Sequence, residues 1–156
     1  MVETDCNASE LIAKGDVVMA SGTTVEEVFS SICSQAKLPS GITSENLVKE
    51  LMEREKVLST AVGNGVAIPH PRRPLVADSK ECCVIVAYLK SPLDMQAPDS
   101  RKVYAMFILL SSSSQLHVKS LASLAAVFRN DIFKKGLVSK PGKEELARLV
   151  QKCEVK

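Results

Sequence analysis

The chain has 156 residues, a formal net charge of +2, a hydrophobic content of 46% and a charged content of 24%. These values are those of an ordinary globular protein, so they argue against disorder, and the net charge is too small to indicate nucleic-acid binding. No apolar run approaches the roughly 20 residues that a membrane span needs, and the acidic N-terminus lacks the apolar segment of a signal peptide. We therefore expect one cytoplasmic domain over residues 1–156, with residues 1–9 loosely ordered.

The cysteines give no sign of a metal site or of a disulfide framework. They are odd in number and lack a CxxC spacing: Cys6, Cys33, Cys82, Cys83 and Cys153. Structural zinc sites use short, recurring ligand spacings, so we predict no metal. We interpret the five cysteines as small apolar residues or surface thiols in a reducing compartment.

The first half of the chain predicts a strand followed by two helices. Residues 16–20 have the character of a short strand that follows a Lys-Gly turn. Thr23 or Thr24 is expected to cap a helix that ends near Ala36, because threonine is a good N-cap and apolar residues then recur at helical spacing. A second helix is expected to begin at residue 43 or 44. Two helices between strands favour a crossover connection and a layered α/β fold.

The second half predicts two buried strands and then three helices. Residues 82–89 and 103–110 are almost entirely apolar, as expected for strands covered on both faces. Ser91-Pro92 is expected to end the first of these strands. The expected helices are one that follows the serine loop 111–114 and is interrupted at residues 129–131, one over 132–138 and one over 143–153.

The chain contains only two histidines, and both are expected where strands meet helices. His70 follows a Gly-Asn-Gly turn and a short apolar strand, and Pro69 fixes the backbone just before it. His117 follows the serine loop at a helix N-terminus, where exposed amides favour negative charge. An imidazole changes protonation near neutral pH and can act as a nucleophile. An anion or phosphoryl site built on the two histidines is therefore one candidate.

Other residues have types that suit an anion, although each also has an ordinary structural explanation. The candidates are the amides of Gly63, Asn64 and Gly65 and the guanidinium groups of Arg54, Arg72 and Arg73. The turn also fits a simple hairpin, and the arginines also fit a solvated charge cluster. Each histidine also fits an ordinary surface or capping residue. The residue pattern by itself leaves these alternatives open.

Two motifs of the chain resemble those of a known family. The first consists of Glu53-Arg54-Glu55, Ser59-Thr60 and residues 63–70, and the second of residues 103–110, Leu116-His117 and residues 121–125. They resemble the IIA domain of the fructose–mannitol class of the bacterial phosphotransferase system, with elements in matching order from Val17 to Cys153. The resemblance implies a three-layer α/β/α fold with a mixed β-sheet flanked by helices.

The resemblance also implies a phosphohistidine carrier. The histidine that ends the family's first motif, His70 here, accepts a phosphoryl group from the phosphocarrier protein HPr. The histidine of the second motif, His117, helps to hold that group, and Arg54 balances its charge. The remaining predicted phosphate-binding residues are Gly63, Asn64, Gly65 and Thr60. We expect no cofactor, and the expected partners are HPr and either a IIB protein or a regulatory target, without nucleic acid or membrane insertion.

The segment Pro71-Arg72-Arg73-Pro74 departs from many family members, which have a glycine or another small residue after the active histidine. Its proline removes a backbone amide beside the site and its arginines add positive charge at the rim, so partner choice is expected to change. With no membrane segment and no attached IIB domain, the chain is similar to the stand-alone nitrogen-regulatory branch. The alternatives are a sugar-specific fructose or mannitol IIA subunit that passes phosphate to a IIB protein, a docking module that is not phosphorylated, and a plain anion-binding domain.

Overall fold

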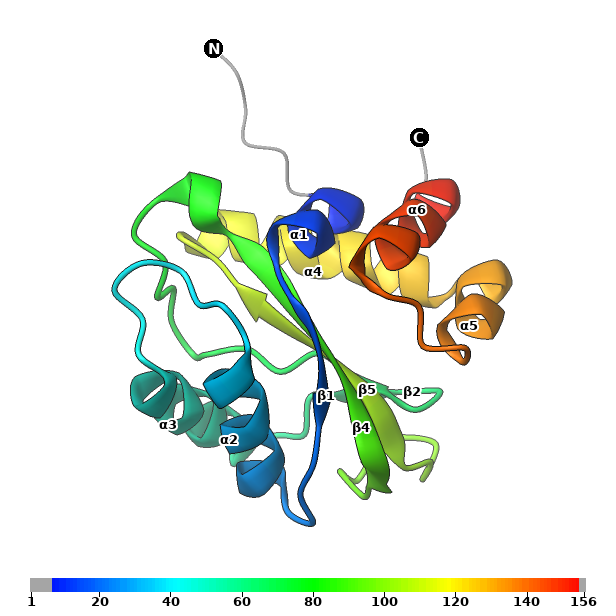
Figure 1. The fold of residues 1–156 in the computed structure, drawn as a ribbon, viewed down its shortest axis with the longest axis horizontal. Coiled ribbons are helices and arrows are strands. Elements are labelled where there is room, and N and C mark those ends of the chain that lie inside the picture. Colours follow the sequence, from blue (N-terminus) through cyan, green and yellow to red (C-terminus); the bar gives the residue numbers. More distant parts are fainter. Residues whose placement is uncertain (1–6, 155–156) are drawn as a thin grey trace.

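The computed structural model describes residues 7–154, which form a mixed β-sheet between two layers of helices (Figure 1). In spatial order the strands are β1 (Val17–Ala20), β4 (Cys83–Leu93), β5 (Val103–Leu110), β3 (Val66–Ala67) and β2 (Ala61–Gly63). One layer consists of α2 (Val25–Gln35) and α3 (Ser44–Glu55), and the other of α1 (Ala8–Lys14), α4 (Ser114–Phe128), α5 (Asp131–Leu137) and α6 (Lys143–Cys153). A short 3-10 helix, η1 (Ser79–Glu81), precedes β4. The expected three-layer fold is confirmed.

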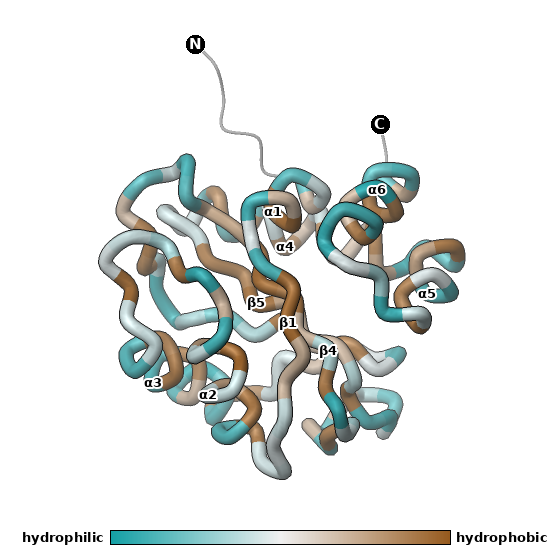
Figure 2. The backbone as a smooth tube through the Cα atoms, viewed as in Figure 1, coloured by the Kyte–Doolittle hydropathy of each residue, from teal (hydrophilic) through white to brown (hydrophobic). Residues whose placement is uncertain are grey.

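Strands β4 and β5 form the antiparallel centre of the sheet, with Cys83 opposite Leu110 and Tyr88 opposite Ala105. β1 runs parallel to β4, β3 runs parallel to β5, and β2 closes the edge antiparallel to β3. Every residue from 84 to 89 is buried, as expected for a strand covered on both faces. Hydrophobic residues accordingly follow the central strands, while hydrophilic ones gather in the outer turns (Figure 2).

The predicted N-cap of α2 is confirmed at Thr24, and α3 and α4 begin with caps of the same kind. The side chains of Thr24, Thr43 and Ser113 accept hydrogen bonds from the backbone N–H groups of Glu27, Asn46 and Leu116 at the starts of α2, α3 and α4. Each bond satisfies one of the amide donors that a first helical turn leaves free. The cap on α4 is the one that matters for function, because His117 lies in the first turn of that helix.

Residues 7–9 were expected to be loose, and instead they begin helix α1. Asn7 caps the helix by accepting a hydrogen bond from the backbone N–H of Glu10 at 3.0 Å, and the helix contacts α6, α4 and β4. The hydroxyl of Ser9 donates to Glu154 Oε1 at 2.5 Å, which links the two ends of the described chain. A helix of seven residues gives only a short apolar pattern in the sequence. The expectation for residues 1–6 lies outside the described residues.

Strand β4 continues to Leu93, past the Ser91-Pro92 pair that was expected to end it. The pairing of β4 with β5 is irregular between Tyr88 and Leu93. A proline has no N–H to donate, and an interruption of the ladder removes the need for that bond. Pro92 is therefore tolerated within the strand.

The cysteines of the described chain belong to the interior. Cys33, Cys82, Cys83 and Cys153 are buried and free, and Cys6 lies outside the described residues. Burial raises the pKa of the Cys33 and Cys83 thiols to about 12, so these two thiols are protonated at neutral pH. Within residues 7–154, no helix combines the length and the apolar character needed to cross a membrane.

Candidate functional site

His70 and His117 lie against each other, with ring centroids 4.7 Å apart and ring planes inclined at 55°. His70 lies three residues beyond the end of β3, and His117 lies in the first turn of α4. Both side chains are half-buried. The structure therefore brings together the two histidines that the sequence singled out.

Backbone hydrogen bonds hold the short segment between β3 and His70 on both sides. The N–H of Ile68 donates to the carbonyl of Thr60 at 3.0 Å, and the N–H of Leu109 donates to the carbonyl of Pro69 at 3.0 Å. These bonds continue the pairing of β3 with β2 and β5 up to the residue before the histidine. His70 is thus attached to the rigid sheet, and not to a mobile loop.

The orientation of the His70 ring assigns different roles to its two nitrogens. Nδ1 lies 2.8 Å from the carbonyl oxygen of Ile68. A carbonyl oxygen only accepts, so Nδ1 carries the proton in this contact, and Nε2 keeps its lone pair when the ring is neutral. Burial lowers the pKa of His70, and the positive charge of Arg54 adds to this effect, while the hydrogen bond to Ile68 and the charge of Glu55 oppose it. The site therefore favours a neutral ring with a nucleophilic Nε2.

His117 is held in a neutral state more strongly. Its pKa is lowered to about 4, first by burial and then by the positive charges of His70 and Arg54. Its backbone N–H donates to the carbonyl of Ser113 at 3.0 Å, and the hydroxyl of Ser113 caps the same helical turn. A neutral imidazole has one N–H donor and one acceptor nitrogen, so His117 can donate a hydrogen bond to a neighbouring oxyanion.

The end of α3 supplies two charged side chains to this region. Arg54 Nη1 donates to the carbonyl of Leu58 at 2.6 Å, and the guanidinium charge lowers the pKa of both histidines. The Glu55 carboxylate accepts two hydrogen bonds from Thr60, one from its backbone N–H at 2.9 Å and one from its hydroxyl at 2.8 Å. Thr60 was predicted to bind phosphate, but its hydroxyl proton is engaged by Glu55. Glu55 itself was missing from the predicted site, although its place beside Arg54 in the first motif was a signal for it.

The Gly63-Asn64-Gly65 turn closes the β2–β3 hairpin. All three residues have positive φ, at 101°, 57° and 82°. The N–H of Asn64 donates to the carboxylate of Asp99 at 2.8 Å, and an amide with an anionic partner is not available to phosphate. A Cβ atom on Gly65 would lie 2.6 Å from the ring of Tyr104, so glycine is also required there by space.

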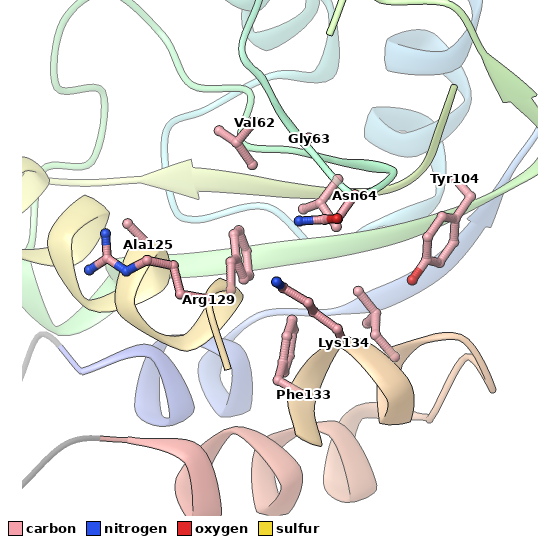
Figure 3. Close-up of a pocket in the computed structure, with 11 residues that line it drawn as sticks. Val62, Gly63, Asn64, Tyr104, Ala125, Arg129, Phe133 and Lys134 are labelled. Carbon is pink, nitrogen blue, oxygen red and sulfur yellow. The ribbon is translucent and has the colours of Figure 1, made fainter. Parts of the chain in front are cut away.

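This turn lies far along the sheet from the histidines. Gly65 pairs through its carbonyl with the N–H of Tyr104, whereas Pro69 pairs with Leu109, five residues further along β5. Five strand residues span roughly 16 Å. The turn borders a cavity of about 230 Å³ that does not include the two histidines. Other residues that line this cavity are Tyr104, Ala125, Arg129, Phe133 and Lys134 (Figure 3). The structure does not place Gly63, Asn64 or Gly65 with the histidine pair, and it favours the hairpin interpretation of the turn.

The segment Pro71–Pro74 forms one wall of a smaller cavity, about 110 Å³, whose lining includes His117. Arg73 Nη2 lies 3.2 Å from Glu50 Oε2, and Glu50 is buried, so the charge of Arg73 is compensated. Arg72 is exposed at the same wall. This arrangement agrees with the expectation that Arg72 and Arg73 lie at the rim of the site. Within residues 7–154, no cluster of three or more histidine, cysteine or acidic side chains is placed to hold a metal ion.

Comparisons with known proteins show what the whole chain is similar to. The family model described as "Phosphoenolpyruvate-dependent sugar phosphotransferase system, EIIA 2" matches residues 10–153. A nitrogen regulatory protein from Bradyrhizobium diazoefficiens is 32% identical over 113 residues, which cover 70% of this chain and 72% of that protein. Among solved structures, the nitrogen regulatory protein IIA-Ntr from Neisseria meningitidis has a TM-score of 0.73 at 24% identity and covers 91% of this chain and 97% of its own. The complex of enzyme IIAMTL with phosphorylated enzyme IIBMTL from Escherichia coli gives a TM-score of 0.66 at 16% identity, covering 88% of this chain and 94% of that one.

Proposed function

Because the chain belongs to the EIIA 2 family of the phosphoenolpyruvate-dependent sugar phosphotransferase system, we propose that it is a phosphohistidine carrier that accepts a phosphoryl group on His70 from an HPr-type phosphocarrier protein. The observation that carries the proposal is the contact between the rings of His70 and His117, whose centroids lie 4.7 Å apart. Phosphoryl transfer depends mainly on positioning and on charge stabilisation. A nucleophilic ring nitrogen that lies beside a second, neutral imidazole provides the positioning.

The proposed step uses the free nitrogen of the ring. The Nε2 lone pair of His70 attacks the phosphorus of the donor's phosphohistidine, a P–N bond forms, and the electron pair of the donor's broken P–N bond returns to the donor ring. The proton of His70 stays on Nδ1, which donates it in a hydrogen bond to the carbonyl of Ile68, so no base has to remove it. The product on this chain is a histidine phosphorylated at Nε2.

Two neighbours stabilise the charge that the phosphoryl group brings. His117 donates a hydrogen bond from its neutral ring, and Arg54 contributes the positive charge of its guanidinium. One Arg54 nitrogen is engaged by the carbonyl of Leu58, and the remaining N–H donors of its fork can serve the phosphoryl oxygens. Donors positioned in advance in this way are the usual source of such stabilisation.

Exposed apolar side chains near these residues support docking of a protein partner. Val118 follows His117 and is 65% exposed, while Val57 and Leu58 follow Arg54 and are 65% and 70% exposed. A partner protein that brings its own histidine to His70 would cover such side chains. We propose an HPr-type donor for this surface and a regulatory role downstream, because relatives that are 28% to 32% identical are nitrogen regulatory proteins.

The proposal is tested by incubating the purified chain with phosphoenolpyruvate, enzyme I and HPr and measuring phosphate bound to the chain. We expect an acid-labile, base-stable label on wild type, and NMR spectroscopy should place it on Nε2 of His70. His70→Ala should lose the label, and the matched His117→Ala variant should fold and accept it more slowly. Full labelling of His70→Ala would overturn the assignment.

A further inference from the structure

The cavity beside His117 contains a buried hydroxyl without a hydrogen-bond partner. Ser111 is one of the residues that line this cavity, and it is 4% exposed. Among the described residues, no group forms a hydrogen bond with Ser111 Oγ. A buried hydroxyl that stays unpaired lowers stability, so such groups usually have a partner that is not part of the chain.

The polar lining of this cavity suits an anion. It comes from Ser111, Ser114, His117, Arg72 and Arg73, and no acidic side chain lines the cavity within the described part of the chain. The nearby carboxylate of Glu50 is paired with Arg73, so within residues 7–154 the charge left without an acidic partner is that of Arg72. The cavity therefore combines a buried hydroxyl, an unpaired cation and a neutral imidazole.

The start of α4 adds to this potential. Ser114 is the first residue of this helix, which has 15 residues, and Ser114 lines the cavity. The N-terminus of a helix carries a partial positive charge from its aligned peptide dipoles. The backbone of Ser111 is fixed beside it, because the Ser111 carbonyl accepts a hydrogen bond from the N–H of Val76 at 3.2 Å.

We propose that this cavity binds a tetrahedral oxyanion, either inorganic phosphate or the phosphate of a small monoester, with Ser111 and Arg72 as its main donors. The cavity of about 110 Å³ has room for a phosphate group. Its lining includes His117 and not His70. This anion is therefore separate from the phosphoryl group proposed for His70, and its binding does not depend on phosphoryl transfer.

The first test measures thermal unfolding in a phosphate-free buffer, with phosphate or with sodium chloride at equal ionic strength. Phosphate should raise the Tm of wild type, because a ligand that binds only the folded state stabilises it. Ser111→Ala should show little or no such rise, and without phosphate it should be at least as stable as wild type, because it removes an unpaired polar group. An equal rise of Tm in both proteins, or no rise of Tm in wild type, would overturn the proposal and indicate that the cavity holds only water.

The second test follows the imidazole signals of His117 by NMR during titration with inorganic phosphate, glycerol 3-phosphate or chloride. We expect a saturable shift with one or both phosphate compounds and none with chloride. The difference between inorganic phosphate and glycerol 3-phosphate shows which of the two the cavity prefers. Arg72→Ala should weaken binding about tenfold or more, because it removes a charged donor. Arg148→Ala, an exposed arginine of α6, should bind as wild type does.

A His70→Ala variant separates this site from the proposed phosphoryl acceptor. It should keep the phosphate-dependent shift of His117, whether or not His70 is labelled by HPr. If His70→Ala abolishes binding while Ser111→Ala retains it, the anion belongs to the histidine pair and the separate site is rejected. Failure of HPr labelling would count against the proposed carrier function and leave this result intact.

Discussion

Glu55 and Thr60 are joined by two hydrogen bonds, from the backbone N–H and from the hydroxyl of Thr60 to the same carboxylate. The carbonyl of Thr60 accepts the N–H of Ile68, and the carbonyl of Ile68 accepts Nδ1–H of His70. A continuous series of hydrogen bonds thus connects the end of α3 to the ring of His70. Changes at Glu55 or Thr60 should alter the orientation of that ring without contacting it.

Thr60→Val removes one hydrogen bond to Glu55 and keeps the side-chain shape. We expect the free energy of unfolding to fall by about 1.5–3 kcal/mol, because the lost bond has a charged acceptor that stays partly buried. Phosphorylation of His70 by HPr should also slow, because Thr60 positions Ile68. Urea unfolding and the labelling rate measure the two effects. Thr60→Ser keeps the hydroxyl and is the control, so equal behaviour of the two variants would contradict this role.

The stability of the fold should fall in mild acid because of His117. Its pKa is about 4 in the folded protein and 6.5 in the unfolded chain, so between these values the unfolded chain binds more protons. The stabilisation is complete above pH 6.5 and is lost as the pH falls toward 4, and the lowered pKa of His70 acts in the same direction. Because His117 is half-exposed, solvent screening makes the loss smaller than the pKa shift alone implies.

The measurement is urea unfolding at about pH 7 and about pH 4.5, which bracket most of this range. Wild type should lose more stability between the two values than His117→Gln, which cannot take up the proton. Parallel losses in the two proteins would show that other groups dominate the acid response.

Ser113→Ala should destabilise the protein by about 1 kcal/mol, because it removes the N-cap of α4. The first turn of this helix carries His117, so fraying there should also reduce the rate at which the chain accepts a phosphoryl group. Ser114→Ala, one residue further on, removes a hydroxyl that makes no capping bond and should change stability little. Chemical denaturation of the two variants side by side measures the contribution of the cap.

Gly65→Ala and Gly41→Ala form a matched pair for the Gly-Asn-Gly turn. Both glycines have φ near +80°, but a Cβ on Gly65 meets the ring of Tyr104, whereas a Cβ on Gly41 has nothing within 4 Å. Gly41→Ala should cost about 1–2 kcal/mol from backbone strain, and Gly65→Ala should cost roughly 1–3 kcal/mol more from crowding. Where Gly65→Ala is still folded, it should accept phosphate from HPr normally. A selective loss of transfer would instead restore the turn as a phosphate-binding element.

Much of the fold can be predicted from the sequence, because the signals for it are local. The bounds of β5 and α6 follow from an unbroken apolar run and from a helical pattern after Pro141-Gly142. The caps at Thr24, Thr43 and Ser113 follow from residue type and position. The first helix was missed because its signal is short, although Asn7 with apolar residues at positions 8, 11 and 12 was a visible cap and face.

The candidate site was predictable only in part, because its geometry depends on strand register. The sequence shows that a turn precedes His70 by five residues, but only the pairing of Gly65 and Pro69 with β5 shows that the extended strand carries the turn away from the ring. The two bonds between Glu55 and Thr60 likewise depend on how α3 meets β2. The cavity at Ser111 required the folded chain, because its walls come from segments that are distant in sequence.

The contact between α1 and α6 has a consequence for the order of folding. Helix α1 is synthesised well before α6, against which it packs, and the hydrogen bond from Ser9 to Glu154 spans almost the whole described chain. Contacts between residues so distant in sequence form late, because a long loop must close before they are gained. During synthesis, α1 therefore stays without its α6 contacts until α6 has emerged, and in that interval its apolar side is open to chaperones.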